Sequence, residues 1–180
     1  MKQVPEGMGF SHAIDYPGCI RGNQIREKGN FAMATVKDIL DRKGKGVVSV
    51  SSEQTVLAAA RLMKERQIGA VVVVEGEKVI GIFSERDISR RVVAEGRDPT
   101  ATPVYEVMTA PVACCCLQTD ILECEFIITD RRIRHLPVLE GGRLEGMVTI
   151  GDLLAMQVEE QNKTIKYLNE YVFMMPPVGE

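Results

Sequence analysis

The chain has 180 residues, of which 45% are apolar and 26% charged, and its formal net charge is −3. These values are typical of a globular protein with one domain or two small ones, and the charge balance gives no support for binding to nucleic acid or to an anionic membrane. No apolar run approaches the roughly eighteen residues that span a bilayer, and charged residues interrupt the first thirty positions, unlike the apolar core of a signal peptide. We therefore expect a cytoplasmic protein.

The cysteines point away from disulfides and zinc. There are five of them and three are consecutive, no CxxC pair occurs, and the two histidines lie far apart. We expect thiols in a reducing compartment, with redox sensing left open as an alternative. The cysteines are Cys19, Cys114, Cys115, Cys116 and Cys124.

In chain order, residues 1–33 show no clean period and contain five glycines, which suggests a flexible tail or an arm over the rest of the chain. A short strand is predicted at 47–50. The sequence SSEQ at 51–54 fits a capping box at the start of a helix. The apolar face expected for that helix consists of Val56, Ala59, Ala60 and Met63.

Residues 70–74, AVVVV, form a continuous apolar run of strand length, as expected for a strand covered on both faces. The turn EGEK then predicts a hairpin into VIGIF at 79–83. A second helix is expected to begin around Ser84 and Asp87.

The same order of elements then occurs again. Residues 67–88 align on 132–153 without a gap, and the repeated unit of about sixty residues reads β-α-β-β-α twice. In the second unit a strand is predicted at 112–116 and a helix around Ile121, Cys124 and Ile128. A hairpin is then expected, with its first strand at 135–139. The identical pairs are Ile68/Ile133, Val73/Val138, Glu75/Glu140, Gly76/Gly141, Gly81/Gly146 and Asp87/Asp152.

A unit of sixty residues is near the lower limit for an independent hydrophobic core. The sequence therefore predicts an α/β (α+β) fold in which two units pack about a pseudo-twofold axis as one compact module. We assign 1–33 to the tail or arm, 34–100 to the first unit, 101–157 to the second, and 158–180 to a C-terminal helix and tail.

The C-terminal helix carries apolar residues at alternating steps of four and three, which is a heptad seam with one polar position. This seam either packs against the chain's own module or forms a homodimer contact. Its residues are Leu154, Val158, Gln161, Ile165, Leu168 and Val172.

The doubled unit and its two turns, GIFSERD at 81–87 and GMVTIGD at 146–152, resemble the CBS domain, named after a regulatory region of cystathionine β-synthase. The chain is similar to bacterial stand-alone CBS pairs. The resemblance implies a regulatory module that binds an adenosine-containing ligand such as AMP, ATP, S-adenosylmethionine or NAD(H), without an obligatory cofactor.

The resemblance also implies roles for individual residues. Asp87 and Asp152 would hold ribose, and Ser84 and Thr149 would face phosphate beside free helix N–H groups. Arg134 and His135 would reach into the pocket around Asp87, which we expect to be the more cationic one. The pocket around Asp152 would meet Gly69 and Ala70 instead, and adenine would lie between Val47, Val48, Val112 and Ala113.

Three further arginines, Arg86, Arg90 and Arg91, exceed what one monophosphate requires. They would hold a longer phosphate chain or a dinucleotide, or else form a solvated basic helix face. The hydroxyl and carboxylate pairs also fit simple helix N-caps.

We expect no enzymatic activity, because no Ser/His/Asp set is recognisable and carboxylates beside arginines stay ionised. The expected function is an adenine-nucleotide sensor, with AMP the first candidate ligand and NAD(H) or ATP the next, that forms a homodimer and regulates an unidentified protein. The alternatives are a dimeric interaction module without ligand control and an NAD(H)-linked redox sensor.

Overall fold

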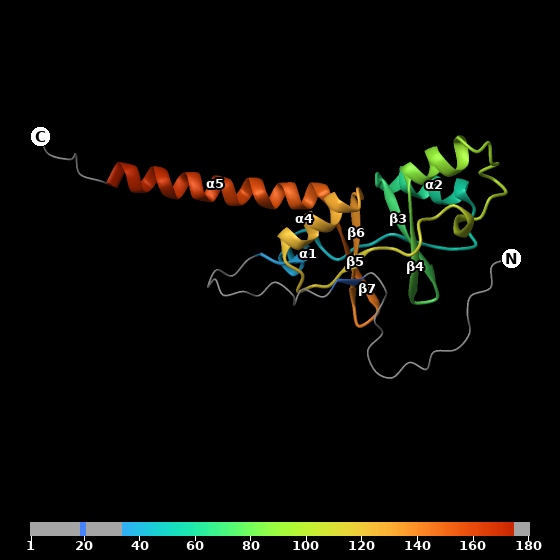
Figure 1. The fold of residues 1–180 in the computed structure, drawn as a ribbon, viewed down its shortest axis with the longest axis horizontal. Coiled ribbons are helices and arrows are strands. Elements are labelled where there is room, and N and C mark those ends of the chain that lie inside the picture. Colours follow the sequence, from blue (N-terminus) through green and yellow to red (C-terminus); the bar gives the residue numbers. More distant parts are fainter. Residues whose placement is uncertain (1–18, 21–33, 175–180) are drawn as a thin grey trace, which may run out of the picture.

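Two β-hairpins stand next to each other at the centre of the molecule, and helices lie on the outer side of each (Figure 1). The computed structural model describes residues 19–20 and 34–174, with side chains between 34 and 170. The first hairpin joins β3 (Ala70–Glu75) to β4 (Lys78–Ser84), and the second joins β6 (His135–Glu140) to β7 (Arg143–Thr149). The architecture confirms the predicted α/β fold with two repeats.

In the first repeat, β2 (Ser49–Ser51) runs parallel to β3, and β3 is antiparallel to β4. The helix α2 (Val56–Arg66) packs on this sheet and buries three residues of the predicted face, Val56, Ala59 and Met63, while Ala60 is partly buried. Past β4 the chain turns through α3 (Glu85–Asp87) into a wider helical segment, η1 (Ile88–Val93).

The predicted capping box at 51–54 is wrong. Helix α2 begins at Val56, and its N-cap is Thr55, whose Oγ1 accepts a hydrogen bond from the Ala58 amide at 3.3 Å. Ser51 cannot cap the helix because it still belongs to β2, where it pairs with Val74. The residues between strand and helix form a turn instead.

In the second repeat, β5 (Cys114–Cys115) runs parallel to β6, and α4 (Ile121–Asp130) covers the sheet. Both first strands are shorter than predicted. Within the range expected to form a tail or arm, residues 19–20 form β1 (Cys19–Ile20), which adds an edge strand parallel to β5. The rest of that range lies outside the described residues.

The two repeats exchange their N-terminal segments. Helix α1 (Val36–Lys43) precedes the first repeat but packs in the hydrophobic core of the second, where Val36 and Leu40 are fully buried. Conversely, the short helical turn η2 (Val104–Glu106) lies before the second repeat and contributes Val104 to the core of the first. A division of the chain near residue 100 therefore does not divide the two cores.

A third hydrophobic cluster lies between the two sheets. Six of its nine residues form pairs related by the internal repeat, such as Val74 with Leu139 and Val79 with Leu144. Equivalent residues meeting across one interface are what a pseudo-twofold arrangement of two repeats produces. The other members of the cluster are Val47, Val72, Cys114, Val112 and Met147.

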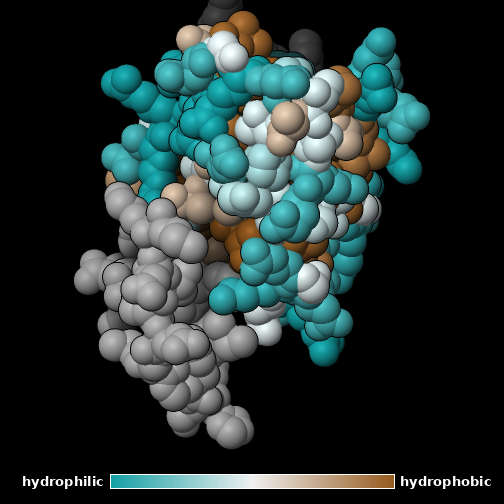
Figure 2. All heavy atoms as spheres, turned by 90° about the vertical axis from the view of Figure 1, so that its right-hand side faces the viewer, coloured by the Kyte–Doolittle hydropathy of each residue, from teal (hydrophilic) through white to brown (hydrophobic). Residues whose placement is uncertain are grey.

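Seen from the end formed by the first repeat, the surface is mostly hydrophilic and hydrophobic residues appear only in separate areas (Figure 2). Among the described residues, no helix is both long and apolar enough to cross a membrane.

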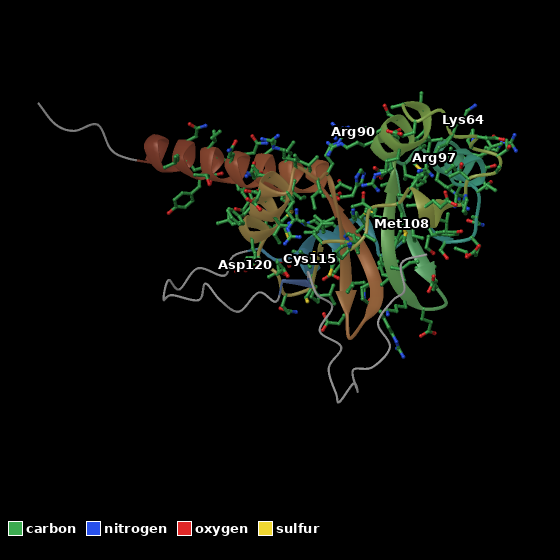
Figure 3. The ribbon with its side chains drawn as sticks, turned by 45° about the vertical axis from the view of Figure 1, so that its right-hand side comes forward. Lys64, Arg90, Arg97, Met108, Cys115 and Asp120 are labelled. Atoms are coloured by element: carbon green, nitrogen blue, oxygen red, sulfur yellow. The ribbon has the colours of Figure 1, made fainter. Side chains whose placement is uncertain are left out.

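The glycine that opens each repeated turn makes room for the exchanged segment. A Cβ atom on Gly146 would lie 2.5 Å from one methyl carbon of Leu40 and 2.7 Å from the other. A Cβ on the equivalent Gly81 would lie 2.5 Å from the sulfur of Met108 and 3.1 Å from the carbonyl oxygen of Thr109. Figure 3 shows Met108 beside the first hairpin. The repeated glycine is therefore a packing requirement on both sides of the molecule.

We predict that Gly146→Ala destabilises the protein by about 1–3 kcal/mol, the usual range for overpacking a filled core, because Leu40 is buried and cannot move aside. Urea unfolding measures this change. The control is Gly46→Ala, where an added Cβ would meet no atom within 4 Å. Equal stability of the two variants would contradict the proposed role of the close contact.

Candidate functional site

A cavity of about 730 Å³ lies between the two repeats. Its walls come from the starts of the inner strands, the ends of both hairpins and the linker between the repeats. Twelve of the fifteen residues expected at the site line this one cavity; the exceptions are Arg90, Arg91 and Asp152. The twelve are Val47, Val48, Gly69, Ala70, Ser84, Arg86, Asp87, Val112, Ala113, Arg134, His135 and Thr149.

Asp87 is buried in the cavity wall at the first turn after β4, with 6% of its surface exposed. Its Oδ2 accepts hydrogen bonds from the amide of Ser84 at 2.9 Å and from the hydroxyl of Ser84 at 2.6 Å. Its Oδ1 accepts a hydrogen bond from the hydroxyl of Thr109 at 3.0 Å. The interpretation of this pair as a helix cap is therefore confirmed, while its role toward ribose stays a prediction.

Asp152 repeats this geometry with Thr149, whose amide and hydroxyl donate to Oδ2 at 2.7 and 2.8 Å. Here a cation joins the pair, because Nζ of Lys43 lies 2.6 Å from the same oxygen. Burial acts to raise the pKa of Asp152, but the hydrogen bonds from Lys43 and Thr149 outweigh it and hold the pKa below its usual value.

Lys43 lines the cavity, so positive charge is found at both ends of it and not only near Asp87. The repeat alignment could not have placed this residue. Lys43 ends α1, and only the exchange of segments brings α1 to the second repeat.

The three arginines that follow Ser84 (Arg86, Arg90 and Arg91) do not line one common surface. Arg86 lines the cavity and donates from Nη1 to the carbonyl of Arg132 at 2.7 Å, which connects the first repeat to the second. Arg91 instead donates to the carbonyls of Val107 and Met108, and its Nη1 lies 3.5 Å from Asp87. It therefore holds the linker.

Arg90 lies outside the cavity lining, on the helical segment that follows Asp87 (Figure 3). Four residues separate Arg86 from Arg90, so in an α-helix the two side chains would lie on one face. Since residues 88–93 form a π-helical segment with more residues per turn, that spacing does not apply.

Two further arginines have exposed side chains at the cavity, Arg131 and Arg134. Neither makes an ion pair with any part of the chain that the structure describes. Glu85 is the acidic residue that sequence analysis missed. Its carboxylate lies beside Gly69, where a Cβ atom would also meet the ring of His135 at 3.7 Å.

The internal repeat, the two hydroxyl–carboxylate turns and the shared cavity agree with a match to the family model of the CBS domain over residues 35–94 and 104–159. The chain belongs to the CBS domain family.

Known relatives extend over most of this CBS pair. The CBS domain-containing protein CBSX3, mitochondrial, of Arabidopsis thaliana is 32% identical over 155 residues, which cover 81% of this chain and 75% of the relative. Among solved structures, the CBS domain NE2398 is 39% identical with a TM-score of 0.68 and covers 70% of this chain and 98% of its own.

A more distant structure shows the same fold with small molecules bound. The CBS domain pair of protein MJ0100, solved in complex with 5′-methylthioadenosine and S-adenosyl-L-methionine, has a TM-score of 0.64 and 22% identity, covering 71% of this chain and 98% of its own.

The Cys115 thiol of the second repeat is poorly suited to redox chemistry. Cys115 is fully buried in the interior of the second repeat (Figure 3). A hydrogen bond with Cys124 and burial together raise the pKa of the Cys115 thiol, which keeps it protonated and unreactive. Among the described residues, no group of three or more His, Cys, Asp or Glu side chains is placed to hold a metal ion.

His135 is the first residue of β6 and lines the cavity. Its charged neighbours include Glu85 of the first repeat and Arg134 of the second. Burial lowers its pKa below the usual value, and the neighbouring Arg134 lowers it further, against the opposing effect of Glu85 and Asp152. The imidazole is therefore neutral near pH 7 and can both accept and donate a hydrogen bond in the cavity.

We predict that the CBS pair loses stability as pH falls below about 6.5, the ordinary histidine pKa, and that His135→Gln reduces this loss. The unfolded chain takes up a proton there while folded His135 resists it. Because the ring is partly exposed, the loss between about pH 7.5 and 5.5 should stay under roughly 1 kcal/mol. Chemical unfolding of both proteins at the two pH values measures it. An identical pH dependence in the variant would assign the effect to other groups.

Proposed function

We propose that the cavity between the repeats binds an adenosine-containing ligand and that this binding regulates a protein partner. The observation that carries the proposal is the composition of the cavity wall. One cavity is lined by the turn that holds Ser84 and Asp87 in the first repeat and by the turn that starts at Thr149 in the second. A ligand that fills it must touch both repeats.

The wall offers different chemistry to different parts of such a ligand. Val47, Val112 and Ala113 provide apolar surface for a base, near the start of each repeat. The hydroxyl–carboxylate turns provide acceptors for sugar hydroxyls, with Asp87 the carboxylate that faces the cavity directly. Arg131 and Arg134 provide positive charge for an anionic tail, and a phosphate is the group that such side chains bind best.

The size of the cavity, about 730 Å³, falls in the usual range for small-molecule sites of roughly 300–1,000 Å³. AMP is the first candidate because one phosphate suffices for the two arginines. The adenosine ligands of the MJ0100 CBS pair support the choice of ligand class. NAD(H) and ATP remain candidates of the same class, since Arg86 adds a further cation to the wall.

A module of this kind acts through linkage and not through catalysis. Asp87 belongs to the first repeat and Arg134 to the second, so a ligand that contacts both favours the arrangement in which they face one cavity. Couplings of this type are typically about 1–3 kcal/mol. The partner that senses the change is a protein.

We predict that Arg134→Ala weakens AMP binding roughly tenfold to a hundredfold, the loss expected for a charge-assisted hydrogen bond, and leaves adenosine binding unchanged. The side chain makes no hydrogen bond or ion pair within the described residues, so the variant should fold normally. Isothermal titration calorimetry measures both ligands. The matched control is Arg90→Ala, an exposed arginine outside the cavity lining, which should bind AMP like the parent protein.

The same calorimetric screen, extended to ATP, NADH and S-adenosylmethionine, decides between the functions. A CBS pair that binds none of these ligands would be an interaction module without ligand control. NADH outcompeting AMP would favour the NAD(H)-linked sensor. Equal losses of AMP and adenosine affinity in Arg134→Ala would show that the arginine does not face the phosphate.

A further inference from the structure

Helix α5 (Ile150–Met174) has a docked beginning and an undocked remainder. Leu153 and Met156 are 2% and 7% exposed and belong to the core of the second repeat. From Gln161 to Glu170, every residue is exposed. Figure 1 shows the helix running straight away from both hairpins.

An exposed apolar stripe runs along α5 from Leu154 into the undocked part. Leu154, Val158, Ile165 and Leu168 are each between 53% and 56% exposed. These are the described apolar members of the heptad seam, and the polar member Gln161 is exposed as well, so the seam does not pack against the chain's own module. Val172, the last predicted seam residue, lies outside the described side chains.

An isolated amphipathic helical segment of this length is expected to be stable only when its apolar face is buried. Isolated helices shorter than about 12–15 residues are marginal in water, and protein helices are stabilised mainly by burying an apolar face. No described residue of the module covers this stripe. A binding partner that buries it would stabilise the helix.

The identities of the seam residues indicate which kind of helix would bury the apolar stripe. In heptad notation Val158 and Ile165 occupy position a, and Leu154 and Leu168 occupy position d. β-branched residues at a combined with leucine at d favour parallel two-stranded coiled coils. Gln161 adds one polar layer at d, a device that fixes register at some cost in stability.

The flanks of the seam point to a second copy of this chain. Positions e and g, which select partners by charge, hold Asn162 and Asn169 at e and Gln157 and Thr164 at g. All four are neutral, so two identical helices meet without repulsion. The charged residues lie elsewhere on the helix, where Glu159 pairs with Lys163 and with Arg42 of α1.

We propose that α5 forms a parallel, in-register coiled coil with α5 of a second copy, joined along Leu154, Val158, Gln161, Ile165 and Leu168. The two CBS pairs then lie at the same end of the coiled coil, because each one precedes the N-terminal end of its helix. This contact does not depend on any bound nucleotide.

The first test uses the full chain in sedimentation equilibrium without nucleotide. We expect a dimer, and we expect Ile165→Glu to raise its dissociation constant more than about tenfold by placing two like charges in the seam. The matched control is Tyr167→Glu, which changes another exposed large side chain outside the seam. Since both side chains lie beyond the module, its unfolding transition should stay unchanged in both variants.

The second test uses the polar layer. Gln161→Leu should lower the dissociation constant more than about tenfold. Gln161→Cys should form a disulfide between identical positions under mild oxidation, identified by mass spectrometry, because position 161 faces itself only in a parallel register.

Two results would overturn the proposal. One is a monomeric parent chain. The other is a dimer that survives Ile165→Glu but is lost in Phe126→Glu, which would place the contact on the exposed face of α4. A dimer without the disulfide at position 161 would reject the parallel register. None of these outcomes depends on nucleotide affinity, so failure here leaves the function proposed for the cavity standing.

Discussion

The exchange of N-terminal segments is the constraint on which the rest of this molecule depends. Each repeat of about sixty residues lacks enough apolar surface for a core of its own, and each receives the missing part from the segment ahead of the other repeat. Gly81 and Gly146 leave the space that the incoming side chains fill. The cavity exists because both repeats are held face to face in this way.

The two repeated carboxylates, of which only Asp87 lines the cavity, have a structural role as well as the proposed binding role. Asp87 and Asp152 each accept hydrogen bonds from the amide and hydroxyl of the residue three positions earlier, which fixes the turn from strand to helix. The same turn presents the hydroxyl residue to the cavity. Changes at either aspartate therefore mix effects on folding with effects on binding, whereas Arg134 carries no such double role.

Much of this arrangement could be predicted because the internal repeat encodes it. The hairpins, the buried faces of α2 and α4, and most cavity residues follow from apolar patterning and from two copies of one turn. The cap of α2 was misplaced because Ser51 stays in β2, where strand pairing outweighs a local capping pattern. Arg90 and Arg91 were misplaced because the segment after Asp87 is wider than an α-helix.

Lys43 could not be predicted for a different reason. Lys43 and Asp152 lie far apart in the sequence, so the sequence does not indicate that their side chains meet. A repeat alignment also gives no sign that the segment before one unit packs on the other unit. Only the three-dimensional exchange of α1 brings the two side chains together. Glu85 was missed because its counterpart in the second repeat is Ile150, so the repeat offered no acidic pair at that position.

Thr149, Ile150 and Gly151 form part of the cavity wall, and the last two are also the opening residues of α5. A helix of 25 residues measures roughly 37 Å at a rise of about 1.5 Å per residue. A tilt of the first turns of this helix by only a few degrees would therefore move its distant tip by several times the displacement at the cavity wall.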